Sequence, residues 1–187
     1  MTFQFKVQLK NLQKPPVWRR LLVPANITFA AFHEIIQASF GWCNYHLYQF
    51  SPKGYGSEPA IGPSGIDEED FEEQDSETVM LGDIFTKPKQ TFNYIYDFGD
   101  DWAHQITLEE ISEKIVLGPV CLDGKGACPP EDCGGPWGYA NLLEILADPK
   151  HSEYKEMREW LGLDKGEELD PNAFDLDDVN LELKSLF

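Results

Sequence analysis

Hydrophobic and polar residues alternate at the start of the chain, as in a strand with one buried face. The hydrophobic positions are Phe3, Phe5, Val7 and Leu9. The next segment, PPVWRRLLVP, is bounded by prolines and is also predicted to be extended. From Thr28 the hydrophobic spacing changes to three and four residues, which predicts a helix that Thr28 caps and Gly41 ends.

The remainder of the chain indicates further strands followed by helices. YHLYQFSP predicts a strand, and TFNYIYDF with WAHQITLEEI predicts a hairpin. Residues 118–138 are rich in Gly and Pro and are expected to form a loop. Helices are expected near 139–147 and 151–162, with a last helix that Asp175 caps and that buries Leu176, Val179 and Leu183. We therefore predict one α+β domain over residues 1–187, a mostly antiparallel sheet with helices packed on one face.

The predicted hairpin has two plausible registers. A loop of Gly99, Asp100 and Asp101 pairs Phe98 with Trp102 and Tyr96 with His104, which places His104 in an aromatic layer. A two-residue Gly99–Asp100 turn instead pairs Asp97 with Trp102, and His104 then shares a face with Asp97. Side-chain packing favours the first register and turn chemistry favours the second.

The net charge disfavours two classes of partner. The chain of 187 residues carries a formal charge of −18, and Arg19–Arg20 is its one close basic pair. A phosphate backbone or an anionic membrane surface would be repelled by such a protein, so direct nucleic-acid binding is disfavoured. The N-terminus has no apolar signal core, and no run of apolar residues is long enough to span a bilayer. We expect a cytoplasmic location.

Half of this charge lies in one segment. Residues 57–78 contain nine Asp and Glu residues and no Lys or Arg. An acidic loop insertion exposed to water is the favoured interpretation, and an arm for a basic partner or for divalent cations is the alternative.

The segment CLDGKGACPPEDCGGPWGY is unusual for a simple connection. Cys121, Cys128 and Cys133 are potential zinc ligands, because the last two are separated by four residues and a histidine could complete the set. Free thiols are the favoured alternative in a reducing compartment. Glu131 and Asp132 lie between two of these cysteines, and paired carboxylates suit acid–base or metal chemistry.

Several motifs in one order resemble the plasmid pRiA4b ORF-3-like family. The matching pieces are PPVWRRLLVP, FHEIIQASFGWCNYHLYQF, YIYDFGDDWAHQITLEE, CPPEDCGGPWGY and FDLDDVN. The resemblance covers nearly the whole chain and implies an α+β domain with no established activity, in a family associated with mobile elements. A resolvase activity is not supported, since a serine recombinase needs a basic DNA-binding helix that this chain does not offer.

The motifs and the resemblance together predict one polar cleft. The candidate ligand-binding residues are Arg19, His46, Asp97, Asp100, His104, Glu131 and Asp132. The leading hypothesis is a non-catalytic module that binds a small ligand or a protein partner beside the Pro-Cys-Gly loop. The alternative is a hydrolase-like enzyme with a carboxylate–His cluster, in which His104 lies within reach of Asp97 or Asp132. The cofactor considered for either is a divalent metal.

Overall fold

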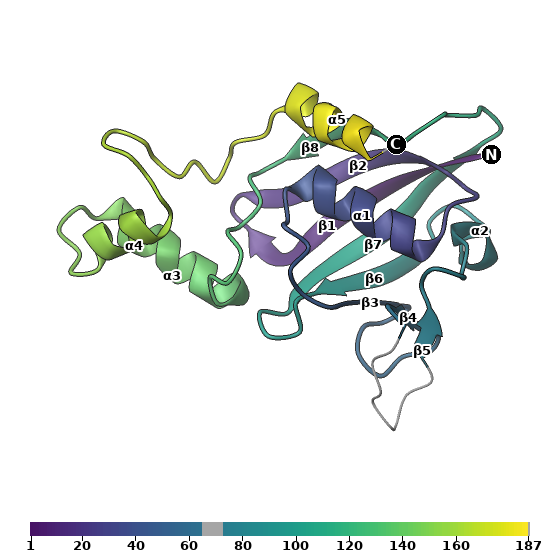
Figure 1. Ribbon diagram of the computed structural model, residues 1–187, viewed down its shortest axis with the longest axis horizontal. Coiled ribbons are helices and arrows are strands. Elements are labelled where there is room, and N and C mark those ends of the chain that lie inside the picture. The colour runs from purple at the N-terminus through teal and green to yellow at the C-terminus, as the bar shows by residue number, and fades with distance from the viewer. Residues whose placement is uncertain (65–72, 187) are drawn as a thin grey trace.

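One large sheet forms the centre of the molecule (Figure 1). The computed structural model describes residues 1–64 and 73–186. The strands are β1 (Thr2–Gln13), β2 (Pro16–Pro24), β3 (Tyr48–Ser51), β4 (Ala60–Gly62), β5 (Glu73–Asp75), β6 (Thr91–Tyr96), β7 (Trp102–Ser112) and β8 (Val120–Lys125). Their order in the sheet is β5-β4-β3-β6-β7-β1-β2-β8, and each neighbouring pair is antiparallel except β4 with β5.

The helices occupy two places around this sheet. They are α1 (Phe29–Phe40), α2 (Leu81–Ile84), α3 (Gly135–Ala147), α4 (Tyr154–Trp160) and α5 (Leu176–Ser185). In Figure 1, α1 and α5 lie over the same face of the sheet, whereas α3 and α4 form a separate lobe beside the strand ends. The α+β fold with a mostly antiparallel sheet is therefore confirmed. Among the described residues, no helix is long and apolar enough to cross a bilayer.

The core is mainly aromatic. Phe5 of β1 contacts Phe32 of α1 and Phe85, with ring centroids 4.9 and 4.8 Å apart. Phe29 of α1 packs against Phe50 of β3 at 5.0 Å. These side chains are almost completely buried, and each excludes a large apolar area from water, so the helix is held firmly on the sheet.

Local sequence signals specify α1 correctly. The Thr28 hydroxyl accepts a hydrogen bond from the Ala31 amide at 3.2 Å, and Gly41 ends the helix with a φ of 97°. Asp175 caps α5 as predicted, by accepting from the amides of Asp177 and Asp178. Of the predicted buried residues in that helix, Leu183 is fully buried whereas Leu176 is exposed.

Both predicted registers of the hairpin are wrong. Tyr96 pairs with Trp102 and Tyr94 pairs with His104, so residues 97–101 form a five-residue turn. The turn is longer because the Asp97 backbone is left-handed, with a φ of 57°, and its carbonyl accepts the Asp101 amide at 2.7 Å. The pairing differs by two residues from the packing-based register, and a shift of two keeps every side chain on the predicted face.

Two other segments differ from expectation. The predicted loop 118–138 contains β8, which pairs with β2 at the edge of the sheet. The predicted insertion 57–78 contributes β4 and β5 to the opposite edge, while its residues 65–72 lie outside the described residues. In both cases the strand completes a sheet edge, and that pairing depends on partners distant in sequence.

Two buried histidines make the fold sensitive to acid. Burial lowers the pKa of His33 to about 4 and that of His104 to about 3. His33 is held by Tyr94 and Asn44, each 2.8 Å from a ring nitrogen, whereas the ring of His104 packs against Phe40 and Tyr94. Among the described residues, no side chain hydrogen-bonds to the His104 ring. The nearby backbone of Trp102 and Tyr94 opposes the lowering of its pKa only in part.

We predict that stability falls as the pH is lowered through the histidine range. Because the folded pKa values lie below the unfolded value of about 6.5, the unfolded chain takes up protons first. The contribution of each histidine to the free energy of unfolding is fully present above about pH 6.5. It is lost as the pH falls to about 4 for His33 and to about 3 for His104. Urea unfolding at pH 7 and at pH 5 measures the free energy of unfolding that is lost between these pH values. In His104→Leu this pH-dependent loss should be smaller by about 2 kcal/mol.

The exposed His151 supplies the control. His151→Gln should keep the pH dependence of the wild type, because it leaves both buried imidazoles in place. An unchanged pH dependence in His104→Leu would contradict the assignment.

Candidate functional site

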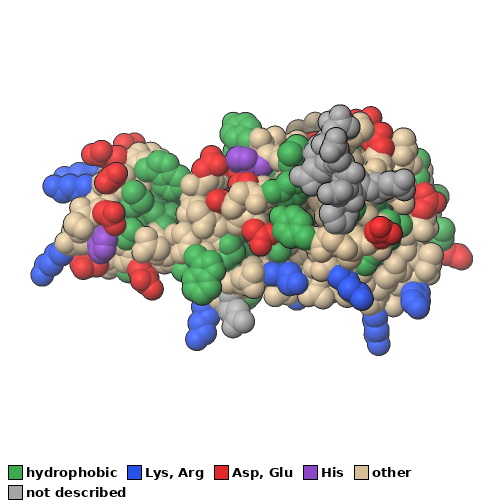
Figure 2. Space-filling view, turned by 90° about the horizontal axis from the view of Figure 1, so that it is seen from below, with side chains coloured by type: hydrophobic (Ala, Val, Ile, Leu, Met, Phe, Trp, Pro, Cys, Tyr) green, Lys and Arg blue, Asp and Glu red, His purple; other side chains and the backbone are tan. Residues whose placement is uncertain are grey.

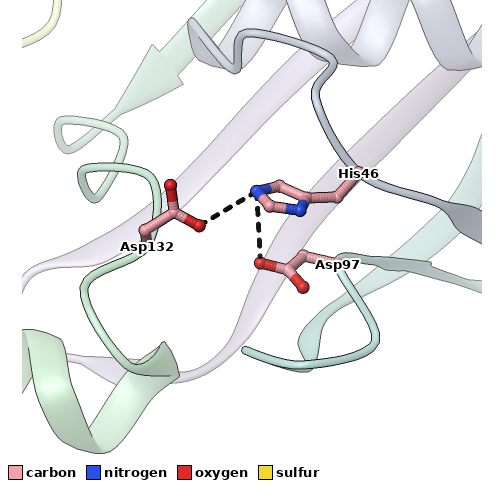
Figure 3. A group of neighbouring side chains, drawn as sticks. All are labelled: His46, Asp97 and Asp132. Carbon is pink, nitrogen blue, oxygen red and sulfur yellow. Dashed lines mark ion pairs between the residues drawn. The ribbon is translucent and has the colours of Figure 1, made fainter.

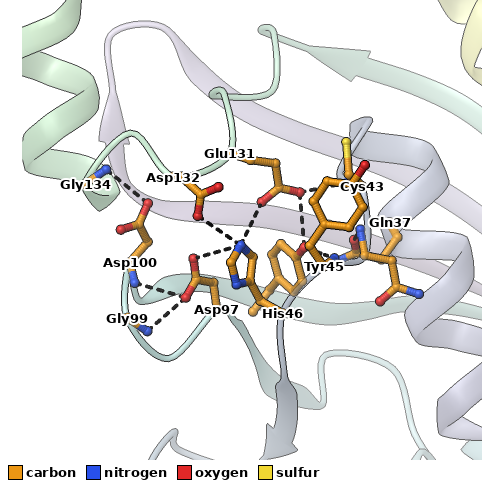
Figure 4. A network of polar contacts seen from close by, with 12 residues as sticks. Gln37, Cys43, Tyr45, His46, Asp97, Gly99, Asp100, Glu131, Asp132 and Gly134 are labelled. Carbon is orange, nitrogen blue, oxygen red and sulfur yellow. Dashed lines mark hydrogen bonds and ion pairs between the residues drawn. The ribbon is translucent and has the colours of Figure 1, made fainter. Parts of the chain in front are cut away.

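Three segments far apart in sequence meet at one end of the central strands (Figure 4). They are the loop 41–47 after α1, the turn 97–101 between β6 and β7, and the loop 131–135 before α3. Each contributes a polar side chain to a small cluster, so the cluster exists only in the folded chain.

Helix α1 positions the first of these loops. Asn44 has a left-handed backbone with a φ of 56°, and its amide donates to the Gln37 side chain at 3.0 Å. The Asn44 side-chain oxygen accepts from His33, and its amide group donates to Glu34 at 2.9 Å. Three contacts to one helix thus fix the backbone two residues before His46.

The turn after β6 presents Asp97 in a single orientation. Its Oδ1 accepts hydrogen bonds from the amides of Gly99 at 2.9 Å and Asp100 at 3.3 Å. Its Oδ2 faces Nε2 of His46 at 3.6 Å. The carboxylate therefore uses one oxygen to hold the turn and directs the other at the imidazole.

Glu131 is held in the same way. Its Oε1 accepts from the Cys43 amide at 2.7 Å and from the Tyr96 hydroxyl at 3.1 Å, and Oε2 lies 3.8 Å from Nε2 of His46. Tyr96 also accepts from the Tyr45 amide at 3.0 Å, which joins β6 to the loop 41–47. Burial raises the pKa of Tyr96, so its hydroxyl remains a donor.

His46 and Asp132 complete the cluster (Figure 3). Oδ1 of Asp132 lies 3.1 Å from Nε2 of His46, which makes this nitrogen the common neighbour of three carboxylates. Yet within the described part of the chain Nε2 has no hydrogen-bond partner of acceptable geometry, and neither has the buried Oε2 of Glu131. His46, Asp97 and Asp132 each place one ligand atom within 4.8 Å of the other two.

Helix α3 is anchored on the turn that carries Asp97. Oδ2 of Asp100 accepts a hydrogen bond from the Gly134 amide at 3.0 Å. Gly135 has a φ of 66°, and a Cβ atom there would overlap the carbonyl oxygen of Asp100. This close approach of two backbones sets the distance between the carboxylate turn and the loop that carries Glu131 and Asp132.

Left-handed backbone conformations are concentrated at these loops. Besides Asn44 and Asp97, they include Asp101 and Asp132, with φ values of 54° and 55°. Asn and Asp tolerate this region better than most residues, but each still costs free energy that the surrounding contacts must offset. The loops are thus held in conformations that orient their side chains.

The structure brings together most of the predicted site residues. His46, Asp97, Glu131 and Asp132 face one another, and Asp100 positions the loops rather than facing the imidazole. His104 does not join them, because it is completely buried in the aromatic layer between α1 and the sheet. The hydrolase hypothesis in the form that requires His104 is therefore wrong.

Arg19 is also separate from the cluster. Its side chain donates to the backbone carbonyls of Ser39, Trp18, Lys125 and Gly126, and its guanidinium stacks between Phe40 and Phe174. All of its nitrogens are engaged by the protein, so it connects the sheet to its helices and does not present a free donor to a ligand.

The cysteines do not form a zinc site, which the sequence favoured less than free thiols. Among the described residues, Cys121, Cys128 and Cys133 do not belong to any group of three ligands close enough to share an ion. Burial raises the pKa of each thiol, to about 12 for Cys133. A raised pKa favours the neutral form of each thiol.

The sequence did not identify two residues on which the site depends. Tyr96 was assigned only to the core face of a strand, and Asn44 was not singled out. The position of Asn44 just after the helix stop Gly41 is a usable signal, since Asn tolerates left-handed backbone. No local signal shows that Tyr96 reaches across to Glu131.

The chain belongs to the plasmid pRiA4b ORF-3-like protein family, whose model matches residues 1–178. It is 39% identical over 163 residues to the uncharacterised protein y4hQ of Sinorhizobium fredii, an alignment that covers 85% of this chain and 80% of that protein. The crystal structure of MM3350, a protein of unknown function from Methanosarcina mazei Go1, has a TM-score of 0.77 and 36% identity. The matched region covers 95% of this chain and 96% of the MM3350 chain, so the two proteins share the whole fold.

We predict that Gly135→Ala destabilises the protein more than Gly162→Ala. The two glycines have nearly the same φ, 66° and 67°, so both substitutions incur the left-handed penalty of about 1–2 kcal/mol. Only the Cβ at residue 135 overlaps another backbone, whereas nothing lies within 4 Å at residue 162. Overpacking should add about 1–3 kcal/mol, measured by urea unfolding.

Equal losses in the two variants would show that the contact between the turn and α3 is not tight. A larger loss in Gly162→Ala would contradict the prediction outright.

Proposed function

We propose that this member of the pRiA4b ORF-3-like family is a binding module that takes up one divalent cation at His46, Asp97 and Asp132, with Glu131 as a fourth ligand. The observation that carries this proposal is the environment of the His46 Nε2 atom. It faces three carboxylate oxygens between 3.1 and 3.8 Å away and makes no hydrogen bond to any of them.

Electrostatics favours a cation at this point. The side chains of Asp97 and Glu131 are 10% and 14% exposed, so part of their hydration has been lost. Carboxylates gathered in a partly dry site repel one another, and a shared cation converts this repulsion into attraction. Asp132 and His46 are more exposed, at 66% and 27%, which leaves the site accessible from solvent.

The hydrogen bonds around the cluster are those that support metal ligands. Asp97 and Glu131 each have one oxygen fixed by donors of the protein and the other directed at His46. Partners of this kind orient a carboxylate for binding through a single oxygen. The orientation is provided before any ion arrives.

The required rearrangement is small. Ligand atoms that share a divalent ion at about 2.1 Å lie no more than about 4.2 Å apart. The three ligand atoms of His46, Asp97 and Asp132 already lie within 4.8 Å of one another. The two separations from His46, 3.6 and 3.1 Å, are already within this limit, and the exposed Asp132 side chain can adjust the third.

The ligand types indicate the class of ion. One imidazole with two or three carboxylates suits Mn²⁺, Fe²⁺ or Zn²⁺ better than Mg²⁺ or Ca²⁺, which prefer oxygen ligands alone. Binding is favoured over catalysis because Asp97 and Glu131 each hold a loop with one oxygen and direct the other at His46, so their contacts serve to orient ligand oxygens.

Titration with Mn²⁺ tests the proposal. Calorimetry should show one equivalent bound, and at one hundred times Kd the stabilisation should be about 2.7 kcal/mol, a rise in Tm of about 5–10 °C. His46→Gln and Asp97→Asn should each weaken binding at least about tenfold, because each removes a ligand. Mn²⁺ is preferred as the probe since it binds thiols weakly, and Cys43 is exposed.

His151→Gln provides the matched control, because it removes an exposed histidine that lies beside Glu153 instead of the cluster. It should leave the affinity unchanged. Absence of binding to Mn²⁺ and to Zn²⁺ at about 1 mM would refute the proposal, as would equal affinity in wild type and His46→Gln.

A further inference from the structure

The face of the sheet opposite α1 and α5 carries basic side chains. Along β1, Lys6 and Lys10 alternate with the buried residues of the core and so point to this outer face. Lys6 lies beside Arg20 of β2, and Trp18 lies beside Lys125 of β8. We name this surface the open sheet face and define it by Lys6, Lys10, Trp18, Arg20, Glu109 and Lys125.

The side chains of this face are arranged around one indole ring. The Lys6 ammonium lies 5.0 Å and the Arg20 guanidinium 5.3 Å from the centroid of Trp18. Arg20 also pairs with Glu109 at 2.7 Å, and Glu109 accepts from Gln4 at 2.8 Å. These contacts hold the cations in place on a rigid surface.

The local charge is opposite to that of the whole protein. With the neighbouring hollow and with Asp123, which pairs with Arg20 at 3.4 Å, the open sheet face has five basic residues against three acidic ones, Glu109, Glu110 and Asp123, in a chain of net charge −18. Figure 2 shows Lys and Arg side chains in a row along one edge of the main body. A concentration of cations on a strongly acidic protein needs a reason beyond solubility.

A hollow of about 260 Å³ adjoins these cations. Gln4, Leu22, Lys114 and Val116 are among the residues that line it. Gln4 is two residues before Lys6 on the same strand and points to the same face. The hollow is large enough for one aliphatic side chain, and it continues the line of Lys6 and Lys10.

We propose that the open sheet face docks an extended acidic segment of a protein partner, which places one apolar side chain in the hollow and carboxylates on Lys6 and Lys10. The lysines are four residues apart on a strand, about 13 Å, which matches two carboxylates four residues apart on an extended peptide. The hollow lies beside Gln4, two residues before Lys6 on the same strand. An extended segment with an apolar residue followed by acids two and six positions later has the complementary pattern.

Nucleic acid fits this face less well. A polyanion several nucleotides long experiences the repulsive field of the entire acidic protein, whereas a peptide with two carboxylates is governed by the nearby lysines within a Debye length. The Trp18 ring is already covered by Lys6 and Arg20, so it is not free for base stacking.

The experiment uses three probes on the full chain. The first is a 12-residue peptide with Leu followed by Glu at two and six positions, the second is the same peptide with Gln in place of Glu, and the third is a dodecamer of thymidine. Titrations followed by amide NMR shifts should show the acidic peptide alone perturbing β1, β2 and β7. The affinity should fall as the salt concentration rises.

Two double variants separate local from global charge. Lys6→Gln with Lys10→Gln should weaken binding of the acidic peptide at least about tenfold. Lys150→Gln with Lys155→Gln makes the same change in net charge on the α4 lobe and should weaken it less than about twofold.

Several results would overturn the proposal. They are no shifts at about 2 mM acidic peptide, equal binding of the Gln peptide, equal losses in the two double variants, or tighter binding of the thymidine dodecamer. The cation titration is independent of these outcomes, because none of the lysines belongs to the His46 cluster.

Discussion

The contact between the β6–β7 turn and the start of α3 is the constraint on which the site depends. Asp100 accepts the Gly134 amide, and Gly135 allows two backbones to approach to a distance that no side chain would permit. Together with the hydrogen bonds that Glu131 accepts from Cys43 and Tyr96, this contact holds Glu131 and Asp132 over the end of the sheet.

Buried polar groups behind the cluster form a hydrogen-bonded network that connects α1, β6 and the loop 41–47. In His33, Nε2 donates to the Asn44 oxygen, so Nδ1 accepts from the Tyr94 hydroxyl, which in turn accepts from Gln37. Each group is satisfied, which suits a low-dielectric interior. The contrast with His46, whose Nε2 makes no hydrogen bond to the three carboxylates around it, is what supports the proposal of a cation site there.

The two histidines of the motif regions illustrate how burial decides a role. His104 lies in a chemically promising stretch, YDFGDDWAH, yet it packs against Phe40 and Tyr94 and burial holds its pKa at about 3. His46 lies in the aromatic stretch YHLYQF, yet it faces the carboxylates. The residues next to a histidine in sequence are a poor guide to its neighbours in space. Successive side chains of a strand point to opposite faces of the sheet, and a loop can carry a side chain away from its sequence neighbours.

The sequence by itself determined the elements whose signals are local. The alternation of β1, the cap and stop of α1 and the Asp175 cap of α5 follow from side chains within a few residues, and the faces of β6 and β7 follow from a period of two. Only the tertiary structure decided the five-residue turn, the pairing of β8 and the meeting of the loops at 46, 97 and 131–132. These depend on contacts between distant segments, whose free energy exceeds the local preferences that a sequence pattern expresses.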